Sequence, residues 1–163
     1  MRFKMLNQLT DRMFEEDDSG GIRERYEDTD VRTLHPLVSA YIGDAYFHLF
    51  VRTRLLSYEQ AKVQVLNRFS AQIVSATWQA HAYRAIEPML TEVERDIFRR
   101  GRNAHSHAPR VASVGDYHIS TGFESLLGTL YLAGDFERLR EIAEASFLAI
   151  ARQMMETKQQ EHR

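Results

Sequence analysis

The 163-residue sequence contains no cysteine, only three prolines and no long apolar run. The absence of cysteine excludes disulfides, thiolate-bound zinc and cysteine nucleophiles, and it fits a reducing compartment such as the cytoplasm. No stretch of about 18 apolar residues is present to span a membrane. Residues 1–18 contain no continuous apolar segment, so we expect no secretory signal. We therefore expect a cytoplasmic protein whose length fits a single core.

Strand patterns are nearly absent, and apolar residues recur at helical spacing through most of the chain. This pattern predicts an all-α domain of about six helices. Two of them should begin at capping boxes, one formed by Ser57 and Gln60 and one by Thr91 and Glu94. The expected helices run from Pro36 to about Leu56, through the sixties, from Ile73 to Ile86, from Thr91 to a C-cap at Gly101, from after residue 117 to near Gly134, and from Asp135 onward.

Charge is unevenly distributed along the chain, although the net charge is only −2. Residues 11–30 hold nine acidic residues and three arginines, whereas residues 95–110 hold five arginines and one aspartate. An arginine-rich segment on a mildly basic body favours contact with a polyanion. We expect residues 1–33 to form an acidic, mobile N-terminal extension, residues 34–153 to form the folded domain, and residues 154–163 to form a polar tail.

One carboxylate stands out in YIGDAYFHLFVR, the helical stretch at residues 41–52. An ionised Asp44 in such apolar company is costly unless a partner stabilises it. The stretch STGFESLLGTLYLAG at residues 120–134 repeats the design with Glu124. Small residues beside each acid leave room for a shared cation, and oxygen ligands favour Mg²⁺ or Mn²⁺. The alternative is that both acids bond to arginines or backbone amides as buried polar anchors.

Several other side chains are candidates for supporting roles. Four arginines and one asparagine could contact phosphates or ribose, and they are Arg99, Arg100, Arg102, Arg110 and Asn103. The alternative for the arginines is a solvated helix end, where cations are favourable in any case. His48 follows Asp44 by four residues, which suits either a metal ligand or a hydrogen-bonded neighbour.

Four segments in order resemble the ribonuclease III family, and specifically its short form, Mini-ribonuclease III. YIGDAYFHLFVR resembles the signature helix of the family, and IVSATWQA at residues 73–80 resembles its Val-Ser-Ala…Gln-Ala helix. RRGRNAHS at residues 99–106 resembles a segment distinctive of the Mini form, and DYHISTGFESLLGTLYLAGDFERL at residues 116–139 resembles the second acidic helix. The resemblance spans about residues 34–143.

The resemblance implies an all-α endoribonuclease that dimerises along its signature helices and cleaves double-stranded RNA. It implies that Asp44 and Glu124 are catalytic and bind Mg²⁺, with Mn²⁺ as a substitute, and that the products carry 5′-phosphate and 3′-hydroxyl ends. The Mini form implies maturation of the ends of 23S ribosomal RNA precursor, with a large-subunit ribosomal protein as a candidate partner. It also lacks a separate double-stranded RNA-binding domain.

The acidic set of this chain is thinner than that of full-length ribonuclease III. Leu37 and Ala40 stand where that form carries two glutamates, and Thr121 stands where it carries an aspartate. A thinned set is typical of the Mini form, and we expect Thr121 and His48 to support the site. Two alternatives stay open: a dimer of this fold that binds RNA without cleaving it in ribosome assembly, and an unrelated all-α metal hydrolase of small phosphate esters.

Overall fold

The computed structural model describes residues 2–13, 16–22, 29–60, 62–104 and 113–161. This part of the chain is helical, apart from turns and an isolated bridge between Glu16 and Ile22. The all-α class expected from the sequence is confirmed. The chain divides into two compact units, Met1–Thr33 and Leu34–Arg163, which are described in turn.

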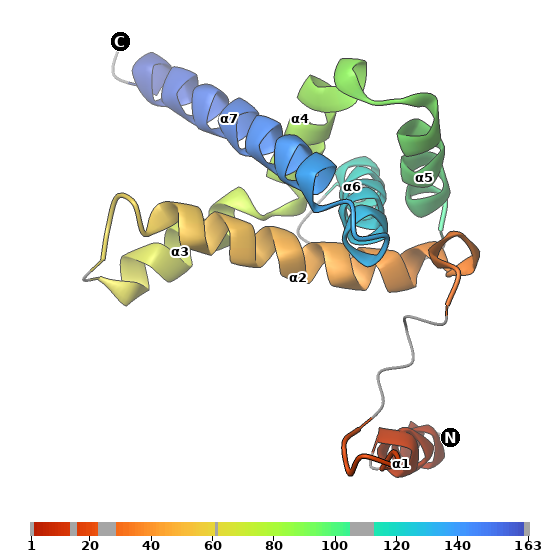
Figure 1. Cartoon of the computed structure of the whole chain (residues 1–163). Coiled ribbons are helices and arrows are strands. Elements are labelled where there is room, and N and C mark those ends of the chain that lie inside the picture. Colours follow the sequence, from red (N-terminus) through yellow and green to blue (C-terminus); the bar gives the residue numbers. More distant parts are fainter. Residues whose placement is uncertain (1, 14–15, 23–28, 61, 105–112, 162–163) are drawn as a thin grey trace. The chain divides into compact units, whose positions relative to one another are not determined.

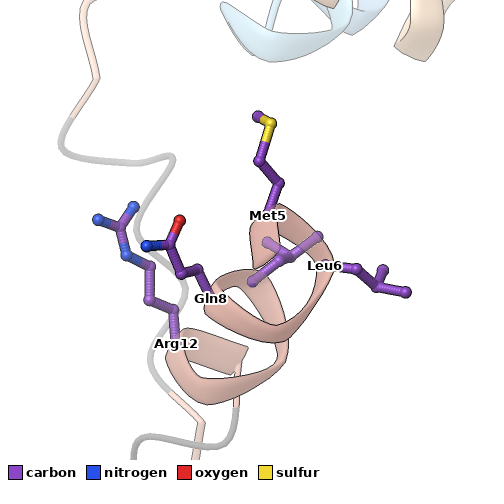
Figure 2. A pocket seen from close by; sticks show the side chains of 5 residues that line it. Met5, Leu6, Gln8 and Arg12 are labelled. Carbon is purple, nitrogen blue, oxygen red and sulfur yellow. The ribbon is translucent and has the colours of Figure 1, made fainter. Parts of the chain in front are cut away.

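The first unit contains helix α1 (Arg2–Met13) and the short 3₁₀ helix η2 (Val31–Thr33). Helix α1 is amphipathic, and its apolar side chains Phe3, Met5, Leu6, Leu9 and Met13 are exposed. Figure 2 shows Gln8 and Arg12 extending to the same side of α1. Both line a hollow on this helix together with Met5, Leu6 and Leu9.

The second unit is a bundle arranged around one central helix. Its helices are α2 (Pro36–Leu55), α3 (Val63–Ile73), α4 (Ala76–Ile86), the 3₁₀ turn η3 (Glu87–Met89), α5 (Glu92–Arg102), α6 (Val114–Leu132) and α7 (Phe136–Glu161). Helix α6 packs against α2, α4, α5 and α7 (Figure 1). Among the described residues, no helix combines the length and the apolar character needed to span a bilayer.

The core of this unit forms where α2, α6 and α7 meet. Phe47 of α2 and Phe123 of α6 are fully buried, and their rings meet edge to face with centroids 5.2 Å apart. Leu126 and Leu127 of α6 and Ile142 of α7 complete this region without exposure to solvent. Helix α6 buries residues on nearly all sides, and its sequence accordingly shows no separate polar face, as expected for a central helix.

Local capping signals fix several helix ends. Thr91 and Glu94 form the capping box predicted from the sequence, in which the Thr91 hydroxyl accepts from the Glu94 amide. The Glu94 carboxylate in turn accepts from the Thr91 amide at 2.7 Å. Gly134 follows α6 with a φ of 74°, and Asp135 accepts from the Arg138 amide at the start of α7. These ends agree with the sequence prediction, since the partners of each cap lie within a few residues of one another.

Other predicted boundaries are wrong. Ser57 and Gln60 do not cap a helix: α3 begins later, at Val63, and the Gln60 side chain donates back to the Leu56 carbonyl. Gly101 is not a C-cap, because α5 continues through Arg102 and buries this glycine. A Cβ at Gly101 would lie 2.5 Å from the Ser125 Cβ, so the glycine permits close contact between α5 and α6.

Three further boundaries differ from the prediction. Helix α4 begins at Ala76 after an N-cap at Ser75, rather than at Ile73. Helix α6 begins at Val114, inside the expected loop, where the Ser113 hydroxyl accepts from the Asp116 amide. Helix α7 continues to Glu161 through the segment expected to be a polar tail.

Candidate active site

Helices α2 and α6 cross with their backbones in contact. A Cβ placed on Gly43 would lie 1.8 Å from the Glu124 carbonyl oxygen, and one placed on Gly128 would lie 1.8 Å from the Ser39 carbonyl oxygen. Only glycine at both positions permits this approach, because any side chain would overlap backbone atoms. The crossing therefore lies directly beside Asp44, which follows Gly43 in the chain.

The crossing brings the two predicted acidic residues together. Burial, and to a smaller extent the nearby charge of Asp44, raise the pKa of the Glu124 carboxyl to about 8. A hydrogen bond from Gln79 of α4 acts in the opposite direction. Asp44 is more accessible, with 51% of its side chain exposed. The site thus pairs a mostly buried acid with one that faces solvent.

His48 lies one helical turn after Asp44 on α2. Its Nε2 atom is 3.3 Å from Asp44 Oδ1, so the two side chains form a hydrogen-bonded pair when the imidazole carries a proton on that nitrogen. This geometry supports the reading of His48 as a neighbour that orients Asp44.

The carboxylates present fit a hard divalent cation. The two acids repel each other, and Glu124 stays protonated near neutral pH because no counter-charge is present. A cation between them would reduce this repulsion. Gln79 Oε1 is also buried beside this region without a hydrogen-bond partner among the described residues. Within the same residues no cluster of three or more histidine, cysteine or acidic side chains forms. A cation held here would therefore keep several waters or take oxygens from a substrate, as Mg²⁺ commonly does.

Two of the positions where full-length ribonuclease III would carry an acidic residue hold buried, uncharged side chains in this chain. Ala40 is 5% exposed at the contact between α2 and α6. Thr121 is equally buried, and its hydroxyl donates to the Tyr117 carbonyl at 3.0 Å. The Thr121 oxygen keeps an acceptor lone pair, so it can still take a hydrogen bond from a water at the site.

The predicted RNA-contact residues lie at the end of α5. Arg99, Arg100, Arg102 and Asn103 are exposed, and Arg99 pairs with Asp96 at 2.9 Å. The fifth candidate, Arg110, lies outside the described residues. The arginines at the end of α5 present a cationic surface of the kind that contacts phosphates, and they also favour the helix C-terminus electrostatically.

Sequence reasoning gave Gln79 no role in the site. The sequence did carry a signal, because Gln79 lies in IVSATWQA, the segment that resembles the Val-Ser-Ala…Gln-Ala helix of the family. The sequence alone could not identify Glu124 as the partner of Gln79, because that contact depends on the packing of α4 on α6.

The described part of the chain is an all-α domain that brings two carboxylates together, and comparison with known proteins assigns its family. The family model "Ribonuclease III domain" matches residues 37–135. A crystal structure of a protein from Fusobacterium nucleatum is similar with a TM-score of 0.64 and 28% identity, covering 71% of this chain and 93% of that one.

Curated relatives narrow the assignment. The chain is 50% identical over 115 residues to Mini-ribonuclease 3 of Symbiobacterium thermophilum, covering 70% of this chain and 88% of the relative. It is 45% identical over 121 residues to Mini-ribonuclease 3 of Thermoanaerobacter sp., covering 74% and 85%. The chain belongs to the ribonuclease III family and, within it, to the Mini-ribonuclease 3 group. It is an endoribonuclease of a family whose members depend on a divalent metal.

Proposed function

We propose that this protein is a Mg²⁺-dependent endoribonuclease that cleaves double-stranded RNA, with Asp44 and Glu124 as the metal-binding carboxylates. The observation that carries the proposal is the raised pKa of Glu124, which arises from burial and from the charge of Asp44 on another helix. A buried acid whose pKa is raised by burial and by a neighbouring carboxylate is a common sign of a functional site. Mn²⁺ would substitute for Mg²⁺, because both prefer oxygen ligands.

The side chains around Asp44 and Glu124 have different roles in the proposed reaction. A bound divalent ion would activate water and stabilise charge on the phosphodiester oxygens. Glu124 would lose its proton on binding a cation. Because the side chain is mostly buried, the carboxylate has little freedom to turn toward solvent. His48 orients Asp44, with its Nε2 atom 3.3 Å from Asp44 Oδ1. Thr121, fixed by its bond to the Tyr117 carbonyl, offers an oxygen acceptor on the same helix as Glu124.

We further propose that the substrate is the duplex formed by the ends of 23S ribosomal RNA precursor, cut to leave 5′-phosphate and 3′-hydroxyl ends. Duplex RNA is recognised chiefly by shape and by phosphate and 2′-hydroxyl contacts. The exposed Arg99, Arg100 and Arg102 supply cations for such contacts. A large-subunit ribosomal protein is a candidate for presenting this RNA, and such a substrate would place the enzyme in the cytoplasm.

We assign the catalysis to residues 34–153, acting as a homodimer along α2. The helix exposes a row of apolar side chains at helical spacing, namely Val38, Tyr41, Ala45 and Leu49. Tyr41 is 75% and Leu49 is 63% exposed. A contiguous apolar surface of this kind supports a protein–protein contact. The acidic extension at residues 1–33 lies outside the residues matched by the family model.

The deciding experiment compares wild type with Asp44→Asn on labelled duplex RNA, with and without Mg²⁺. We expect the variant to bind the duplex as wild type does and to cleave it at least about 100-fold more slowly, because it loses charge that the metal site needs. Asp11→Asn, in the N-terminal unit, serves as the matched control and should cleave normally. Normal cleavage by Asp44→Asn would show that the site assignment is wrong.

The same assay separates the alternative of a non-cleaving RNA-binding dimer. That alternative draws on the thin acidic set, in which buried Ala40 and Thr121 supply no carboxylate. It predicts that wild type binds duplex RNA with equal affinity in the presence and absence of Mg²⁺ and leaves it intact.

A further inference from the structure

Gln79 is a buried polar side chain on a third helix, and it hydrogen-bonds with Glu124 of the carboxylate pair. It belongs to α4 (Ala76–Ile86) and is 1% exposed. Its Nε2 atom donates to the Val74 carbonyl at 2.9 Å, at the junction between α3 and α4. The amide is therefore attached to a backbone position that precedes its own helix.

The chemistry of the amide fixes its orientation. The Val74 carbonyl can only accept a hydrogen bond, so the nitrogen of the Gln79 side chain must face it. The same nitrogen carries a second proton, and Gln79 hydrogen-bonds with the Glu124 carboxyl. One primary amide thus connects a fixed backbone carbonyl to the buried acid of the site.

The other end of the amide is left without a partner. Oε1 is buried, and no hydrogen-bond donor among the described residues reaches it. A methionine or leucine would fill a similar volume without this unsatisfied acceptor. The hydrogen bond to Val74 accounts for the amide nitrogen, whereas no described residue accounts for the amide oxygen. An unpartnered acceptor beside a carboxylate pair suits a water that enters together with a hydrated cation.

We propose that Gln79 is a positioning residue that holds the Glu124 carboxylate in place for a divalent cation, and that its free Oε1 accepts a hydrogen bond from a water at the site. This inference rests on the proposed function of Asp44 and Glu124. A carboxylate whose orientation is already held by a fixed amide loses less conformational freedom when it binds the ion. Gln79 acts through Glu124 and does not itself contact the RNA.

The test replaces the amide by an apolar side chain of similar shape, Gln79→Met, and measures Mn²⁺ binding to the RNA-free protein by calorimetry. We expect the affinity for Mn²⁺ to fall about tenfold, as is typical when a residue supporting a metal ligand is removed. The Mg²⁺ concentration for half-maximal cleavage should rise by a similar factor. Affinity for duplex RNA, measured in Ca²⁺, should stay unchanged.

Ser146→Ala is the matched control. Ser146 is fully buried on α7, and its hydroxyl donates to the Ile142 carbonyl of its own helix at 2.8 Å, so its loss should leave Mn²⁺ affinity unaltered. Gln79→Leu replaces the methionine variant if circular dichroism shows that the latter is unfolded. Wild-type Mn²⁺ affinity in the apolar variant overturns the inference, as does an equal loss in Ser146→Ala. Failure of wild type itself to bind Mn²⁺ overturns the proposed carboxylate site instead.

Discussion

Gly43 and Glu124 are in backbone contact across the crossing of α2 and α6. The position that a Cβ of residue 43 would occupy is 1.8 Å from the Glu124 carbonyl oxygen, closer than any pair of non-bonded atoms can lie. The glycine that precedes Asp44 therefore determines how near the other acid can come. The spacing of the carboxylates depends on a residue that takes no part in the chemistry.

Gly43→Ala should strongly destabilise the protein. The added methyl group has no space, so α2 and α6 must separate, and we expect the free energy of unfolding to fall by about 3 kcal/mol or more. Gly115→Ala is the matched control, because its Cβ would meet no atom within 4 Å in the first turn of α6. That variant should be unchanged or more stable by about 0.5–1 kcal/mol. Urea unfolding of both variants checks the prediction, and equal stabilities would contradict the backbone contact.

The raised pKa of Glu124 predicts that the metal-free protein loses stability as pH rises. The folded state holds the Glu124 proton up to about pH 8, whereas the unfolded state releases it near 4.5. Between these values the folded state binds more protons, so the free energy of unfolding falls with increasing pH. Glu124→Gln should remove this slope and stabilise the metal-free protein by about 4 kcal/mol at pH 8.

Urea unfolding at pH 5 and pH 8 in the presence of EDTA measures this effect. Adding Mn²⁺ to wild type should raise stability more at pH 8 than at pH 5, because the ion competes with the Glu124 proton. The Glu124→Gln variant should show little response to Mn²⁺ at either pH. A wild-type slope retained in Glu124→Gln would assign the pH dependence to another group.

A charge placed on the exposed row of α2 should abolish dimer formation. Leu49→Glu puts a carboxylate into the apolar surface that we assign to the homodimer, where burial of an unpaired charge is costly. Sedimentation velocity should then give the mass of a dimer for wild type and of a monomer for the variant. Val93→Glu is the control, since Val93 is 71% exposed on α5 and should leave the mass unaltered. A monomeric wild type would refute the assignment.

Loss of an arginine from α5 should weaken RNA binding and reduce its dependence on salt. If Arg99 contacts a phosphate, Arg99→Ala lowers the slope of log affinity against log salt concentration by about 1. Arg32→Ala, in the N-terminal unit, is the control and should keep the wild-type slope. Fluorescence anisotropy with duplex RNA at several salt concentrations provides the measurement. An unchanged slope in Arg99→Ala would remove this residue from the phosphate-contact set.

Features determined by neighbouring residues could be predicted from the sequence. The capping box of Thr91 and Glu94 is formed as expected, because both partners lie within four residues of each other. The pattern of Ser57 and Gln60 looks the same in sequence, yet no cap forms there, since α3 begins only at Val63 and the Gln60 side chain bonds to the Leu56 carbonyl. A local motif is therefore permissive, and tertiary packing decides whether it is used.

Features determined by contacts between distant segments could not be predicted. Gly101 has the position of a C-cap in the sequence, but its small size serves contact with Ser125 on α6. The juxtaposition of Asp44 and Glu124 was expected as a hypothesis, whereas the contribution of Gln79 required the packing of α4. The roles of Asp44 and Glu124 remain predictions.

Glu94 contributes to more than the start of α5. The carboxylate that closes the capping box also receives two hydrogen bonds from Arg138 of α7, at 2.7 and 3.0 Å, and Arg138 donates in addition to the Met89 carbonyl. Gly101 and Gly122 hold the other end of α5 tightly against α6. Helix α5 is thus secured at its start to α7 and at its other end to α6, the helix that carries Glu124. If the arginines of α5 bind one phosphate and the carboxylates act on another, the helical bundle sets the number of base pairs between these two phosphates. The distance from the bound phosphate to the cleaved one would then be constant.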